Sequence, residues 1–101
     1  MRKPTSVKIF GQKYKIRYDY ASEENYGVTD SQNNLIHMRN DMQNDKQIRV
    51  LMHELTHAVL AESLLSGRKR LTEEEVCDLV GFHITDMLRD NPEIVAWLLS
   101  E

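Results

Sequence analysis

The sequence has little of what defines several protein classes. It has a single cysteine, Cys77, so an internal disulfide is excluded and a disulfide-stapled secreted scaffold is not expected. No apolar run approaches the roughly 18 residues that a membrane helix needs, and no secretory signal follows the first residues. We therefore expect a cytoplasmic protein without a membrane partner.

Glycine and proline are also scarce, with 4 and 2 residues, and there is no repeat or linker-like stretch. Of the 101 residues, 41% are hydrophobic and 29% are charged, as in an ordinary globular protein. These values predict one domain that spans residues 1–101. A domain of this size buries only about 60–70% of its unfolded surface, so a bound metal ion would add useful stability.

Residues 1–43 predict strands and loops. Apolar and basic side chains alternate over residues 7–18, the period-two pattern of a half-buried strand pair, and residues 10–13 predict the hairpin turn between them. Two shorter strands are expected at residues 27–30 and 35–38. The turn-forming residues 31–34 join them.

From Asn44 onward the pattern becomes helical. Asn44 with Gln47 resembles a capping box and predicts a helix over residues 44–65. Thr72 with Glu75 is a second capping box, which predicts a helix over residues 72–90. Pro92 then starts a short helix over residues 92–100. The fold class expected is α+β, with a small, mostly antiparallel sheet packed on the first helix.

The first helix carries apolar residues on two faces. We therefore expect it to be sandwiched between the sheet and the next helix. Two histidines, His53 and His57, fall on the face that would meet the next helix.

These histidines belong to the motif His53-Glu54-Leu55-Thr56-His57, an H-E-x-x-H pattern inside a predicted helix. Residues four apart stand one above the other on a helix, so both imidazoles can reach one ion. Neutral imidazole is a preferred ligand of Zn²⁺. Glu54 is rotated by about 100° from His53, so it can act as a general base beside the metal instead of binding it.

A catalytic zinc site needs a third protein ligand. The candidates lie at the start of the next helix, in the run Glu73-Glu74-Glu75 and at Cys77. Glu75 has a structural role as the capping partner of Thr72, and we interpret Cys77 as a small core residue. Helical periodicity leaves Glu73 and Glu74 as open alternatives.

Several segments besides the motif match a known family. They are residues 7–14, 26–30, 51–58, 74–81 and 88–92. On these residues the chain resembles the small zinc-peptidase-like proteins of phages and prophages, close to the ImmA/IrrE-type metallopeptidases of the gluzincin group. The resemblance covers the chain from Val7 to Leu99.

The resemblance implies a minimal zincin-like fold in which Glu74 is the third metal ligand and Asp78 is its companion, a carboxylate that does not bind the metal but orients a metal-bound imidazole. It also implies a zinc-dependent peptidase, encoded by a phage or prophage, that acts on a protein or peptide in the host cytoplasm. In such folds a strand edge beside the metal takes the substrate backbone, and residues 35–38 are one candidate edge.

The reaction that the resemblance implies is metal-assisted hydrolysis. Zinc lowers the pKa of its water toward 7 and polarises the scissile carbonyl, while Glu54 takes the proton and delivers it to the leaving amine. Tyr26, His37 and His83 are the side chains to consider for stabilising the oxyanion.

Two other functions fit parts of the sequence. The first is a zinc-stabilised, non-catalytic protein-binding module of a mobile element; the intact Glu54 argues against it, because a structural site has no use for a base there. The second is nucleic-acid binding, since residues 1–18 hold six basic side chains and no acidic one. The net charge of −3 argues against a nucleic-acid partner, and alternating lysines also keep an edge hairpin from aggregating.

Overall fold

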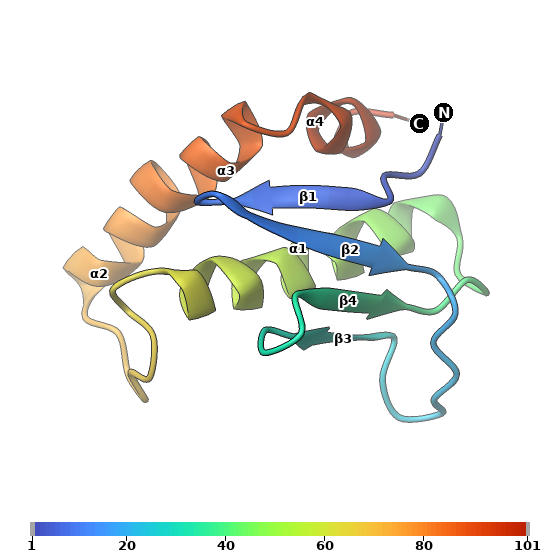
Figure 1. The fold of residues 1–101 in the computed structure, drawn as a ribbon, viewed down its shortest axis with the longest axis horizontal. Coiled ribbons are helices and arrows are strands. Elements are labelled where there is room, and N and C mark those ends of the chain that lie inside the picture. Colours follow the sequence, from blue (N-terminus) through green and yellow to red (C-terminus); the bar gives the residue numbers. More distant parts are fainter. Residues whose placement is uncertain (1, 101) are drawn as a thin grey trace.

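A computed structural model describes residues 2–100, which form an α+β fold with a four-stranded mixed sheet and helices that follow it in sequence (Figure 1). The helices α2 and α3 are joined by the π-helical segment η1 into one continuous helical stretch. The elements are β1 Ser6–Ile9, β2 Gln12–Arg17, β3 Gly27–Asp30, β4 Leu35–Met38, α1 Asn44–Glu62, α2 Glu73–Asp78, η1 Leu79–Ile84, α3 Thr85–Arg89 and α4 Pro92–Leu98.

The strand order in the sheet is β1-β2-β4-β3. The pairs β1–β2 and β3–β4 are antiparallel, as expected, whereas β2 and β4 are parallel, which makes the sheet mixed. The expectation that residues 35–38 form a free edge is wrong, because β4 pairs with β2 on one side and with β3 on the other. The edge strands are β1 and β3, and the Asn91 side chain covers part of the β1 edge by accepting from the Lys8 amide and donating to the Lys8 carbonyl, both at 2.7 Å.

The hairpin between β1 and β2 forms where the sequence predicts it. Phe10 and Gly11 connect the strands, with φ values of 49° and 85°. Positive φ at both central residues is the signature of a type I′ turn, whose twist matches that of the flanking strands. This turn fixes the register that pairs Ile9 with Gln12.

The start of α1 differs from its prediction. The helix is preceded by Gln43 as N-cap, and no side chain caps it, so the Asn44–Gln47 capping box is wrong. Both side chains serve tertiary contacts instead. Asn44 Oδ1 accepts a hydrogen bond from Trp97 Nε1 (3.1 Å), and Gln47 Nε2 donates to the Arg39 carbonyl (2.7 Å).

The other two helix starts agree with the sequence. Thr72 Oγ1 accepts from the Glu75 amide (3.1 Å), while Glu75 Oε1 accepts from the Thr72 amide (3.0 Å), so the second capping box is confirmed. Pro92 is in the first turn of α4. The helices end one to three residues before their predicted ends, α1 at Glu62, α3 at Arg89 and α4 at Leu98. No helix within residues 2–100 has both the length and the apolar character that crossing a membrane requires.

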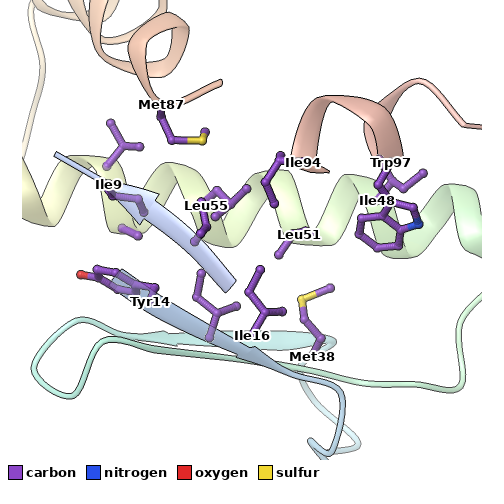
Figure 2. Packing of buried hydrophobic residues seen from close by; sticks show 14 of the residues in the cluster. Ile9, Tyr14, Ile16, Met38, Ile48, Leu51, Leu55, Met87, Ile94 and Trp97 are labelled. Atoms are coloured by element: carbon purple, nitrogen blue, oxygen red, sulfur yellow. The ribbon is translucent and has the colours of Figure 1, made fainter. Parts of the chain in front are cut away.

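One hydrophobic core lies between the inner face of the sheet, α1 and the C-terminal helices. Figure 2 shows Ile9, Tyr14 and Ile16 of the sheet gathered near Leu51 and Leu55 of α1, with Met87, Ile94 and Trp97 closing the cluster. These side chains are buried.

The buried residues of α1 all lie on one face of the helix. The expectation that α1 is sandwiched between the sheet and the next helix is therefore wrong. Its second apolar face is only half-buried at Val50 and Leu60, and Leu64, beyond the helix end, is 97% exposed. The face that carries His53 and His57 is therefore open to solvent.

Candidate active site

An open groove of about 840 Å³ lies between α1 and the edge strand β3. The helix contributes His53, Glu54 and His57 to its lining, and β3 contributes Gly27, Val28 and Thr29. The two histidines and the glutamate of the H-E-x-x-H motif thus line one open depression, whereas Leu55 between them is buried in the core.

The two imidazoles are neighbours on the solvent-facing side of α1. Their ring centroids are 4.9 Å apart and the rings are inclined at 75°. The His53 side chain is 68% exposed, and His57 is exposed as well. Neutral imidazole is a preferred zinc ligand, and rings one helical turn apart can reach one ion, so these two rings are the candidate metal donors.

Glu54 differs from the histidines because it is buried, with only 6% of its surface exposed. Its Oε1 accepts a hydrogen bond from the Thr29 hydroxyl at 2.8 Å. The same hydroxyl lies 2.9 Å from the Glu54 carbonyl oxygen, and Oε2 lies 4.0 Å from His53 Nε2. One carboxylate oxygen is thus held by β3 while the other is turned toward a histidine.

Gly27 permits this close contact between β3 and α1. A Cβ atom at residue 27 would lie 3.3 Å from Glu54 Cγ, 3.2 Å from Met38 Sδ and 3.1 Å from the His37 carbonyl oxygen. Such distances are tighter than ordinary packing allows, and one of the three atoms is backbone. A larger residue at position 27 would push the edge strand away from the carboxylate.

The sequence reasoning missed the roles of Gly27 and Thr29. In the strand pair, Gly27 lies opposite Met38 and Thr29 lies opposite Ile36. Met38 and Ile36 are buried, so Gly27 and Thr29 occupy inward positions of β3. Inward positions of a strand usually carry apolar side chains. A glycine and a threonine at two successive inward positions therefore mark a place where something polar must be approached closely.

The structure does not bring the acidic run of α2 to the histidines. Glu73 and Glu74 are exposed and Asp78 is half-buried, and residues 2–100 contain no group of three His, Cys, Asp or Glu side chains placed to hold a metal ion. Glu74, with Glu73 as the alternative, stays a prediction for the third ligand, as does Asp78 for its companion.

Glu75, the last acid of that run, and Cys77 have other surroundings. Glu75 caps α2 and lies 3.3 Å from Arg68, and its hydrogen bonds at Thr72 lower the pKa of the carboxyl. The interpretation of Cys77 as a core residue is wrong, because its side chain is exposed.

Of the three side chains considered for the oxyanion, Tyr26 lines the groove. Lys46 Nζ lies 3.8 Å from its ring centroid, and the hydrogen bond and charge of Lys46 lower the pKa of the phenol. His37 is elsewhere, with Nδ1 3.3 Å from Asp19, and His83 packs edge-on against Phe10. The groove therefore favours Tyr26.

Comparisons of the chain with protein-family models, with curated proteins and with solved structures found no match. The function must therefore be argued from the chemistry of the groove. That chemistry comprises two exposed imidazoles, a buried carboxylate and a phenol beside an amine.

Proposed function

We propose that this chain is a zinc-dependent metallopeptidase with a minimal zincin-like fold, in which α1 carries the metal ligands and the general base. The observation that supports this most is the contrast within the motif. Glu54 is buried and held by Thr29, whereas His53 and His57, on either side of it, are open to the same groove. A held carboxylate beside two accessible imidazoles is the set of groups that metal-assisted hydrolysis uses.

His53 and His57 would hold the zinc ion, with Glu74 as the proposed third ligand. Bound zinc supplies Lewis-acid polarisation of a carbonyl group and lowers the pKa of a water molecule. The exposure of both rings leaves room for water and substrate in the groove. An open coordination position of this kind distinguishes a catalytic zinc site from a structural one.

Glu54 has the proposed role of general base. Its carboxylate takes a proton from the attacking water and then delivers that proton to the nitrogen of the leaving amine, so the carboxylate is regenerated. Thr29 holds Oε1, which leaves Oε2 as the oxygen turned toward the histidines. The Tyr26 phenol is the group proposed to donate a hydrogen bond to the oxyanion.

The proposed substrate is an extended peptide or protein segment. β3 borders the groove and pairs with β4 on one side only, so the other edge of its backbone is free for strand addition. The proposed position of the substrate is therefore along β3 instead of residues 35–38. Main-chain hydrogen bonds would then set the peptide next to Glu54.

The test compares the wild-type protein with Glu54→Gln, both loaded with zinc, on a library of quenched fluorescent peptides. We expect Glu54→Gln to keep its zinc and to lose roughly 10²–10⁴-fold in cleavage rate, because the general base is removed. Glu93→Gln, an exposed acid of α4, is the matched control and should cleave like wild type.

Wild-type protein that holds zinc but cleaves no peptide in the library would contradict the proposal. It would support the alternative, a zinc-stabilised protein-binding module without catalysis. Cleavage that persists at the wild-type rate in Glu54→Gln would contradict the role given to Glu54.

A further inference from the structure

The outward face of the sheet carries a row of cations. Lys13, Lys15 and Arg17 alternate on β2 with buried Tyr14 and Ile16, so all three point away from the core. Lys8 of β1 joins them, because the register places it directly opposite Lys13. We call these four residues the basic face. In Figure 1, α1 runs behind β2, on the other side of the sheet.

Protection against aggregation does not explain this arrangement. That explanation applies to edge strands, and β1 is an edge, but β2 is an interior strand paired on both sides. Like charges directly opposite each other, such as Lys8 and Lys13, also destabilise a sheet.

The basic face has no ion-pair partner among the residues that the structure describes. Asp90 and Glu93 line one surface hollow together with Lys8 and Lys13, but neither acid forms an ion pair with them. The cations are therefore available to an external anion.

An aromatic pair adjoins the last cation of the row. Arg17 is the register partner of His37 on β4, and the His37 ring lies 6.3 Å from the Tyr20 ring, inclined at 38°. Both residues are half-buried. Asp19 is the acid at this end of the row, with its carboxylate 3.3 Å from His37 Nδ1.

We propose that the basic face binds single-stranded nucleic acid. Alternate residues of a strand are about 6.7 Å apart, so β2 offers a regular row of cations along which a phosphate backbone can run. Tyr20 and His37 then offer ring faces on which a base can stack, and stacking beside a cationic track is the usual mode of single-strand binding. An acidic protein segment would use the cations but would have no need of the aromatic pair.

This binding site is independent of the proposed peptidase. The basic face lies on the outward side of the sheet, whereas Glu54 and Thr29 lie on the side that faces α1. A nucleic-acid strand and a peptide can thus be bound at the same time. Failure of one proposal leaves the other standing.

The test is fluorescence anisotropy of a labelled oligothymidine of about 20 nucleotides, titrated with the whole chain at about 50 mM and about 200 mM salt. We expect binding that weakens with salt. The variant Lys13→Gln/Lys15→Gln/Arg17→Gln should bind at least about tenfold more weakly, with a shallower salt dependence. Tyr20→Ala/His37→Ala should bind about fivefold to tenfold more weakly, with the salt dependence unchanged.

The matched control removes three exposed cations elsewhere, in Lys69→Gln/Arg70→Gln/Arg89→Gln. It should bind within about twofold of wild type. Urea unfolding of each variant verifies that the fold is retained. The cation variants replace exposed side chains and should be as stable as wild type, whereas Tyr20 and His37 are half-buried, so binding by their variant is measured where it is fully folded.

Four outcomes would overturn the proposal. The first is no binding at the lower salt concentration, and the second is an equal loss in the control variant, which would mean that only net charge matters. The third is tighter binding of a duplex of the same length. The fourth is displacement of the oligothymidine by polyglutamate at equal charge concentration, which would identify an acidic protein as the partner.

Discussion

The Thr29 hydroxyl on β3 contacts both the side chain and the main chain of Glu54 on α1, at 2.8 Å from Oε1 and 2.9 Å from the carbonyl oxygen. A hydroxyl has one hydrogen to donate, so the two acceptors share it. This contact joins the edge of the sheet to the carboxylate proposed as the general base. It also fixes the side-chain conformation of that carboxylate.

Replacing Thr29 by valine should therefore destabilise the protein. Valine has nearly the same shape but no hydroxyl, so a buried carboxylate oxygen loses its donor, which costs about 1–3 kcal/mol. Thr29→Ser keeps the hydroxyl and should recover most of that loss. Urea unfolding of the three metal-free proteins measures the difference. Equal stability of Thr29→Val and wild type would show that the contact has no energetic weight.

Gly27→Ala should separate the edge strand from α1. The added methyl group would lie 3.1–3.3 Å from three atoms, one of them backbone, so we expect a loss of about 1–3 kcal/mol. Gly81→Ala is the control, because a Cβ there meets no atom within 4 Å. It should be neutral or stabilising in a helical segment. Thermal unfolding of both variants measures the effect, and equal melting temperatures would contradict the close fit at Gly27.

Three of the tyrosines, Tyr14, Tyr18 and Tyr26, should titrate in a defined order relative to one another. Burial, with help from Glu62, raises the pKa of Tyr14 to about 12, and burial raises the pKa of Tyr18 further. The pKa of Tyr26 is lowered by its hydrogen bond with Lys46. Tyrosinate absorbance should therefore appear first from Tyr26 and last from Tyr18, as Tyr26→Phe and Tyr18→Phe can verify.

The raised pKa values predict how stability depends on pH. Folded Tyr14 keeps its proton above the ordinary pKa of 10.0, whereas the unfolded chain releases it. The stability from this group is thus complete below pH 10 and is lost as the pH rises toward about 12. Urea unfolding between these pH values should show a declining free energy, with a smaller decline in Tyr14→Phe. A free energy independent of pH over this range would contradict the burial of these phenols.

Glu74→Gln and Glu73→Gln should differ in zinc affinity. If Glu74 is the third ligand, its amide variant loses a charged oxygen donor and should bind zinc at least about tenfold more weakly, while Glu73→Gln stays near wild type. Competition with a fluorescent zinc chelator measures both affinities. The reverse order would assign the ligand to Glu73, and unchanged affinity in both variants would remove α2 from the site.

The sequence predicted well those features that local interactions decide. The hairpin at Phe10–Gly11, the Thr72–Glu75 capping box and the start at Pro92 all depend on residues a few positions apart. Asn44 and Gln47 fit the same local rule, yet their side chains bind Trp97 and Arg39. Local spacing does not reveal which distant groups compete for a side chain.

Other features depend on strand order and on long-range packing, which a periodic pattern leaves open. β4 looks like any short strand, but the parallel pair with β2 makes it interior. The roles of Thr29 and Gly27 arise only when β3 is placed over α1. The position of the H-E-x-x-H motif in a helix followed from its spacing, whereas the acidic run Glu73–Glu75 gave no information on its distance from the histidines.

Zinc content of the purified protein tests the central claim most directly. Elemental analysis after dialysis against zinc-containing and then zinc-free buffer should find about one zinc per chain in wild type and almost none in His53→Ala or His57→Ala. Both histidines are exposed, so the variants should stay folded. Wild type without zinc, or variants that keep it, would contradict the proposed metal site and with it the proposed peptidase.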